Sequence, residues 1–174
     1  MMHSVILLSL TSLLTAAQCR SQSSDSSFSK SHELSTHSQK VKNPNDFLYT
    51  GWYYITDSVT KSRRQLEKTN EFFYVSPKPI TSAKNITQII IYNRKEGGYG
   101  LIMKLGDVGT NAWSSATYKS INKKLGFILD NKLLEVDYVA AQITGGTTAL
   151  TQGAFSKEEL ENFKKSIEDE KYSN

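Results

Sequence analysis

The sequence predicts an α+β fold, in which a largely antiparallel sheet carries two helices packed on one face. From Gly51 onward, short runs of β-branched and aromatic residues alternate with Gly, Pro and Asn, a pattern typical of strands and turns. Only two segments show helical spacing, one after Asp107 and one after Ser156. Because strands and helices do not alternate regularly, the pattern favours α+β over a parallel βαβ arrangement.

The strands are expected at short apolar runs. The run Ile86–Tyr92, with three successive isoleucines, is predicted to be a buried strand. Gly97-Gly98, Asp130-Asn131 and Gly145-Gly146 are predicted to be turns, since Gly and Asn tolerate positive φ. The remaining strands are expected at Gly51–Ile55, Phe72–Val75, Tyr99–Leu105, Leu125–Leu129, Leu133–Val136, Tyr138–Ile143 and Thr147–Thr151.

Each helix has its own start signal. Asp107 is the expected N-cap of the first helix, because its carboxylate can accept free backbone N–H groups. The second helix follows a capping box formed by Ser156 and Glu159. Its apolar stripe for packing on the sheet consists of Leu160, Phe163 and Ile167.

The first nineteen residues, 1–19, are predicted to be a signal peptide. Val5–Ala17 is uncharged and apolar but shorter than the roughly 20 residues of a membrane span. No Lys or Arg precedes it, so an uncleaved N-terminal anchor is the alternative. Cys19, the single cysteine, is a candidate lipidation site, although Ala16 and Gln18 fit that motif poorly and cleavage after Ala17 competes with it.

A serine-rich segment, residues 20–45, follows the signal. It has few large apolar residues and no periodicity, so we expect a disordered tether. The folded domain is therefore predicted to span 46–171.

The charge pattern bears on the class of partner. The formal charge is +4, from 21 basic and 17 acidic residues. The basic residues are spread along the chain and form no recognition stripe, which argues against a nucleic-acid partner.

The sequence does not favour catalysis. No histidine follows His37, Cys19 lies outside the predicted domain, and no G-x-S-x-G motif is present. We therefore expect no enzyme activity, no catalytic or metal site and no cofactor. Asp130, Glu135 and Asp137 lie close together and suggest either a cation site or, as the favoured interpretation, solvated acids near a hairpin.

Aromatic residues are the candidates for partner binding. Neighbouring side chains of a strand point to opposite faces, so one residue of each aromatic pair is expected to face outward. Tyr53, Tyr99 and Tyr138 are selected as exposed, partner-binding residues, because a tyrosine combines an apolar ring with a polar tip.

Four sequence blocks occur together and in order: LIMKLGDVG (Leu101–Gly109), SINKKLGFILDNK (Ser120–Lys132), ITGG (Ile143–Gly146) and GAFSKEE (Gly153–Glu159). They resemble the head subdomain of the first periplasmic domain in the SecD and SecDF protein-export family. Asn131 stands where that family favours Gly, a substitution compatible with positive φ.

The resemblance implies a function for the domain. SecD and SecDF are multi-span membrane proteins that help to pull exported chains, and their head is thought to contact the emerging polypeptide. The similarity covers only this head, so it implies a binding module without the membrane motor.

We accordingly expect a noncatalytic envelope module that binds polypeptide or another envelope protein. The alternative is a structural or inhibitory surface protein with one dedicated protein partner. In both cases the protein would be exported, and either periplasmic or membrane-anchored. Membrane contact is expected only through an N-terminal lipid or an uncleaved signal.

Overall fold

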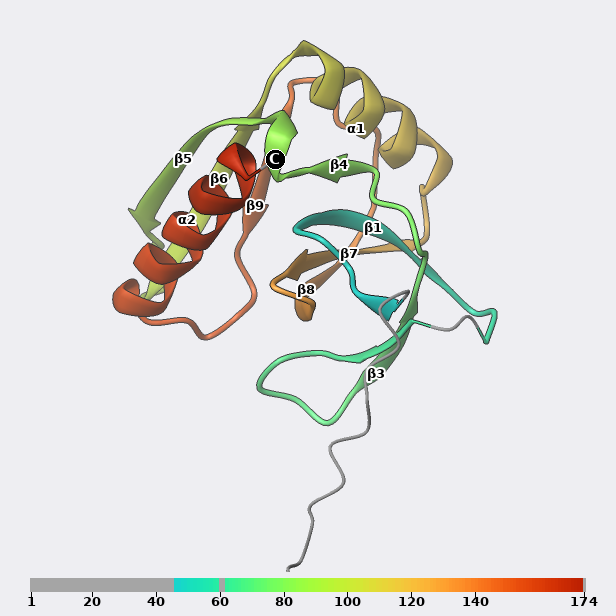
Figure 1. Ribbon diagram of the computed structural model, residues 1–174, viewed down its shortest axis with the longest axis horizontal. Helices are drawn as coiled ribbons and strands as arrows, with labels where there is room; N and C mark the ends of the chain where they lie inside the picture. The colour runs from blue at the N-terminus through green and yellow to red at the C-terminus, as the bar shows by residue number, and fades with distance from the viewer. Residues whose placement is uncertain (1–45, 60–61, 174) are drawn as a thin grey trace, which may run out of the picture. The chain divides into compact units, whose positions relative to one another are not determined.

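The computed structural model describes residues 46–59 and 62–173, and their strands form two antiparallel sheets (Figure 1). The larger sheet has the order β2-β3-β1-β7-β8, with β4 also paired to β1, and the smaller has the order β5-β6-β9. The strands of the larger sheet are β1 (Gly51–Thr56), β2 (Arg63–Gln65), β3 (Phe72–Val75), β4 (Thr81–Ser82), β7 (Lys124–Leu129) and β8 (Lys132–Tyr138). Those of the smaller sheet are β5 (Ile86–Asn93), β6 (Tyr99–Leu105) and β9 (Thr147–Leu150).

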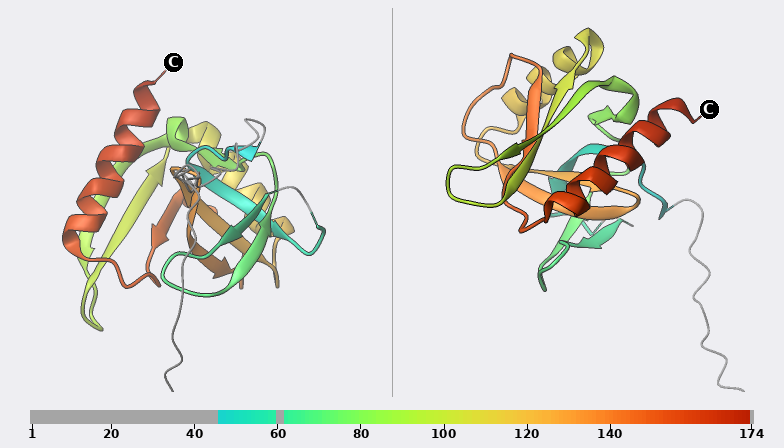
Figure 2. Two further views of the ribbon diagram at one scale, coloured as in Figure 1. Left: turned by 60° about the horizontal axis from the view of Figure 1, so that its bottom comes forward. Right: turned by 90° about the vertical axis from the view of Figure 1, so that its left-hand side faces the viewer.

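Two α-helices accompany the sheets: α1 (Asp107–Lys119) and α2 (Lys157–Tyr172). The predicted α+β class, with antiparallel pairing and two helices, is confirmed; the strands divide between two sheets. Both views in Figure 2 show α2 running alongside β5 and β6. No helix in the described part of the chain is long and apolar enough to span a bilayer. The expected signal and tether lie outside the described residues.

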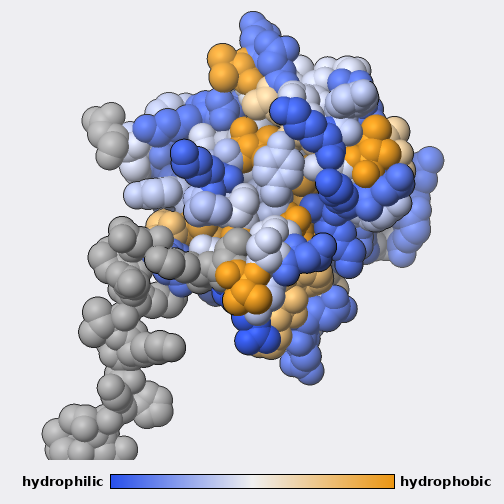
Figure 3. Space-filling model, turned by 90° about the vertical axis from the view of Figure 1, so that its right-hand side faces the viewer, coloured by the Kyte–Doolittle hydropathy of each residue, from blue (hydrophilic) through white to orange (hydrophobic). Residues whose placement is uncertain are grey.

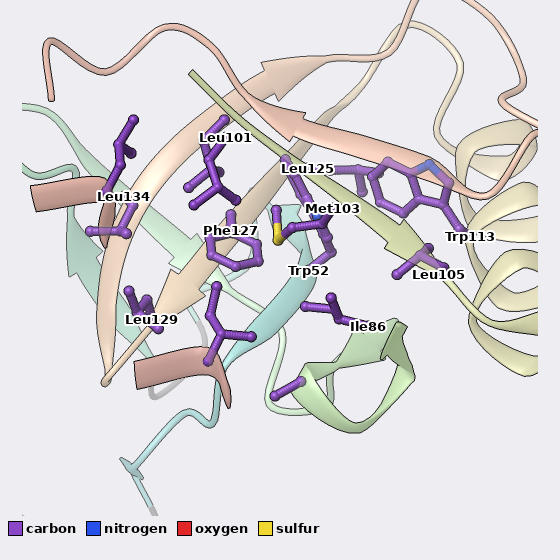
Figure 4. Close-up of a cluster of buried hydrophobic side chains, with 14 of the residues drawn as sticks. Trp52, Ile86, Leu101, Met103, Leu105, Trp113, Leu125, Phe127, Leu129 and Leu134 are labelled. Atoms are coloured by element: carbon purple, nitrogen blue, oxygen red, sulfur yellow. The ribbon is translucent and has the colours of Figure 1, made fainter. Parts of the chain in front are cut away.

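The main core lies between the two sheets (Figure 4). Trp52 and Phe127 come from the larger sheet and Leu101 and Met103 from the smaller, and all four are at most 1% exposed. The rings of Trp52 and Phe127 lie 5.3 Å apart. Trp113 of α1 joins this core, as do Leu160 and Ile167 of α2.

A second, smaller core covers the other face of the larger sheet. It contains Leu48, Tyr53, Val75, Ile128 and Leu133. Since β1 lies between β3 and β7 and is covered on both faces, Tyr53 is only 1% exposed. Its hydroxyl donates to the carbonyl oxygen of Tyr49 at 2.7 Å. The prediction that Tyr53 is exposed is therefore wrong.

The predicted hairpin at Asp130-Asn131 is confirmed. Both residues have positive φ, 48° and 65°, as a two-residue turn with matching twist requires. The Asn131 side chain also accepts hydrogen bonds from the Leu48 N–H at 3.0 Å and from Arg64 at 2.7 Å.

The predicted start signals correctly located both helices, but the N-cap of α1 lies one residue earlier than expected. The capping box is present: Ser156 Oγ accepts from the Glu159 N–H at 3.1 Å, and the Glu159 carboxylate accepts from the Ser156 N–H at 2.7 Å. The N-cap of α1 is Gly106, and Asp107 is instead the first helical residue. Its carboxylate still lies at the positive end of the helix dipole.

The predicted strand Tyr138–Ile143 is wrong. β8 ends at Tyr138. The next residue, Val139, still forms two backbone hydrogen bonds with the segment before β7: its N–H donates to the Lys123 carbonyl and its carbonyl accepts from the Asn122 N–H, each at 2.9 Å. Beyond Val139 the chain crosses towards β9, and the Ile143 N–H donates to Thr117 Oγ1 of α1 at 3.0 Å.

Candidate functional site

A groove runs between strand β5 and helix α2. Two hollows of about 530 and 370 Å³ compose it, one at each end of the strand. We call it the β5–α2 groove; it is lined by residues 86–93 of β5, by Tyr99 of β6, and on α2 by Lys157, Glu161, Lys164, Ile167, Glu168, Lys171 and Tyr172.

The free edge of β5 faces this groove. Among the described residues, β5 is the terminal strand of its sheet and pairs with β6 alone. The larger hollow is lined by the consecutive residues 89–93. Because successive side chains of a strand point to opposite faces, a hollow touching every residue follows the edge of the strand.

The position of β5 at the edge corrects another expectation. Ile86–Tyr92 was predicted to be buried, but only Ile86 is, and Ile89–Tyr92 are half-buried. Ile89 and Ile91 lie opposite Met103 and Leu101 and face the main core, whereas Ile90 and Tyr92 face the other side of the sheet.

The α2 wall of the groove carries charge. Lys157, Lys164 and Lys171 recur every seven residues, which places them on one side of the helix. Lys164 lines both hollows and is half-buried, and it forms no ion pair within the described residues. Glu161 and Glu168 alternate with the lysines and are exposed.

Tyr99, the first residue of β6, is half-buried and lines the larger hollow of the groove. It pairs with Asn93, the last residue of β5. Tyr138 lies at a different place, on a mainly apolar hollow of about 480 Å³ that also includes Trp113 and Ile143. Tyr138 is 58% exposed, and its hydroxyl donates to Asn122 Oδ1 at 2.7 Å. The three selected tyrosines therefore do not form one site, and Cys19 lies outside the described residues.

The favoured interpretation of Asp130, Glu135 and Asp137 as solvated acids is wrong for Glu135. Glu135 is 2% exposed because its side chain points between the sheets. Its carboxylate accepts from the backbone N–H groups of Thr151 at 2.8 Å and Gln152 at 3.2 Å. It thus joins β8 of one sheet to the end of β9 in the other.

Asp137 lies two residues further along, on the same face of β8. The pKa of Asp137 is raised to about 7. Burial is the main cause, and the negative charge of Glu135 and a hydrogen bond with its side chain add to it. Asp137 accepts from the Gln152 side-chain amide at 2.7 Å. Asp130 is exposed in the hairpin, and the described residues contain no cluster of three or more metal-ligating side chains.

The face in Figure 3 shows apolar residues in small separate patches among hydrophilic ones. The β5–α2 groove was missed because edge strands cannot be identified without knowing the pairing. The seven-residue spacing of the lysines was the one sequence signal that pointed to it.

Comparison with known proteins gives a consistent result. The model of the family described as "SecDF, P1 head subdomain" matches residues 57–168. The chain is similar to the protein translocase subunit SecD of Acetobacter pasteurianus, with 32% identity over 63 residues. This matched region makes up 36% of this chain and 12% of that protein. The chain therefore spans about an eighth of the length of this relative.

Two solved structures have a similar fold. One is described as SecDF in a super-membrane-facing form; it has a TM-score of 0.55 and 11% identity, over 70% of this chain and 18% of that one. The other is described as the membrane component SecDF that enhances protein export; it has a TM-score of 0.55 and 10% identity, over 72% of this chain and 64% of that one. At such low identity these similarities concern the fold alone. Together with the family match over more than half of the chain, they confirm the resemblance found in the four sequence blocks, and the chain belongs to the SecDF P1 head subdomain family.

Proposed function

We propose that this protein is a noncatalytic protein-export module that contacts polypeptide chains through the β5–α2 groove. Its family membership supports a role in export. The single observation that carries the binding site is the free edge of β5, which lies in a groove with half-buried isoleucines. Unpaired backbone groups beside apolar surface are suited to binding another chain through main-chain hydrogen bonds.

The proposal includes the location and arrangement of the protein. Residues 1–19 act as an export signal, 20–45 as a tether and 46–171 as the binding domain, in the periplasm or anchored at the envelope. Lipidation of Cys19 would supply the anchor. In this arrangement the domain acts without a motor of its own, and Tyr99 is the partner-contacting aromatic of the groove.

A second candidate function is the binding of one dedicated protein partner. It is favoured by the mainly apolar hollow at Tyr138, where an exposed aromatic ring borders Ile143, itself 40% exposed. This site would suit an apolar side chain of a folded partner.

Site-specific photocrosslinking tests the primary proposal. A benzophenone amino acid replaces Tyr99 in the groove or, as a control, Tyr118, which is 64% exposed on α1. The full chain is then incubated with a permanently unfolded polypeptide and with a folded protein of similar size. We expect crosslinks from position 99 to the unfolded polypeptide only, and few from position 118. Equal crosslinking at both positions, or none at 99, would reject the groove as the site.

A further inference from the structure

The geometry of the β5–α2 groove points to a specific mode of binding: an extended segment adds to β5 as a new strand, and Lys164 binds an acidic side chain of that segment. This inference rests on the proposed function and names the class of ligand. It concerns conformation and charge, which the proposed function leaves open.

The dimensions of the groove suit a strand. β5 has 8 residues, which correspond to about 26 Å of extended chain. α2 has 16 residues, or about 24 Å of helix. The two elements run antiparallel, because the N-terminal half of α2 borders residues 89–93 and its C-terminal half borders residues 86–89 (Figure 1). An added strand would therefore have β5 along one side and α2 along its whole length.

The backbone of β5 supplies the first half of the recognition. Within the described residues, its backbone partners are in β6, on the side away from the groove, except that the N–H of its first residue, Ile86, donates to the carbonyl oxygen of Ala83. From residue 87 onward, the N–H and C=O groups that point away from β6 thus lack a partner in the part of the chain that the structure describes. Their natural complement is the main chain of another strand, which can bind without regard to most of its side chains.

Lys164 supplies the second half. It lines both hollows midway along the helix and is half-buried, and it forms no ion pair with any residue that the structure describes. A lysine in such a place can bury its apolar stem while its ammonium group binds a ligand. Its helical neighbours Glu161 and Glu168 are exposed. Because side chains alternate along a strand, only every second residue of the ligand faces α2, and the acidic residue must belong to that set.

The test uses the full chain and a synthetic peptide of alternating Val and Ser with one central Glu in the Val set. Affinity is measured by fluorescence anisotropy for the peptide, for its Glu→Gln form and for forms N-methylated at one residue at a time. N-methylation removes a main-chain donor, so we expect losses of about tenfold at every second position only. The Glu→Gln change should weaken binding about three- to fivefold at low salt, as for a partly exposed ion pair.

Protein variants then assign the charge effect. Lys164→Met keeps the apolar stem and should abolish the difference between the Glu and Gln peptides. The matched control Lys165→Met should retain it, since Lys165 is exposed and pairs with Asp169 at 2.5 Å. If the peptides bind without a two-residue period, or if Lys164→Met leaves the Glu preference intact, this binding mode is overturned while polypeptide binding stands. If neither the peptides nor an unfolded polypeptide bind, the proposed function fails with it.

Discussion

Replacing Asp137 with Asn is expected to make the domain more stable above neutral pH. In the folded state the pKa of Asp137 is about 7, compared with an ordinary value of 3.8, and burial beside the Glu135 carboxylate is the cause. Between these values the folded protein binds more protons than the unfolded chain, so raising the pH lowers the free energy of unfolding. The favourable contribution of the protonated Asp137 is complete below pH 3.8 and is lost as the pH rises through 7.

The size of the effect follows from the shift in pKa. A change of about three units corresponds to about 4 kcal/mol, at about 1.4 kcal/mol per unit. Because Asp137 is still partly accessible to water, screening reduces this to about 2 kcal/mol. Asn has a similar shape and stays neutral, its oxygen can accept from Gln152, and its amide can donate to Glu135.

Urea unfolding at several pH values between 5 and 8 measures this prediction. The wild type should lose about 1 kcal/mol more than Asp137→Asn over this range, because the rest of the loss falls between pH 3.8 and 5. Asp169→Asn serves as the control, because that carboxylate is exposed and pairs with Lys165 on the helix surface. If the wild type and Asp137→Asn lose stability in parallel as the pH rises, the pKa of Asp137 is not raised in the folded state and the reasoning is refuted.

Three further substitutions, one of them with a matched control, test the packing of the core and the N-terminal cap of α2. Gly51→Ala should lower the free energy of unfolding by about 3 kcal/mol in thermal or urea unfolding, because a Cβ there would overlap the carbonyl oxygen of Thr81. Gly145→Ala is its control and should have little effect, since open space surrounds that position; equal losses would contradict the packing. Met103→Ala should cost about 3 kcal/mol, because its side chain is fully buried between the sheets, and a loss below about 1 kcal/mol would contradict the two-sheet core. Ser156→Ala should cost about 1 kcal/mol and reduce the helical circular dichroism signal of α2 on warming; an unchanged melting curve would show that this cap contributes nothing.

The family and much of the local structure could be predicted because their signals lie within a few consecutive residues. The hairpin at Asp130-Asn131 needs positive φ at both positions, and Asn and Asp tolerate it. The capping box of α2 links two residues three apart, so it is visible in the sequence. The four blocks that resemble the SecD and SecDF family lie between Leu101 and Glu159, inside the region matched by the family model.

Apart from the seven-residue spacing of the α2 lysines, the features of the candidate site could not be predicted, because they depend on which strands become neighbours. Tyr53 is buried since β1 is an inner strand with a core on both faces. The isoleucines of β5 are half-buried since β5 is an edge strand, although their sequence alone is typical of a central one.

For this protein, then, the sequence by itself determined the fold class, both helices, the principal turns and the family, because propensities, caps and motif spacing act over short distances along the chain. Only the tertiary structure decided that, among residues 46–59 and 62–173, β5 has a free edge beside α2 and Lys164 has no ion pair at the middle of the groove. It also decided that Glu135 is buried against Thr151. The physical reason is that burial and charge environment arise from contacts between segments far apart in sequence, and the pairing of the strands sets those contacts.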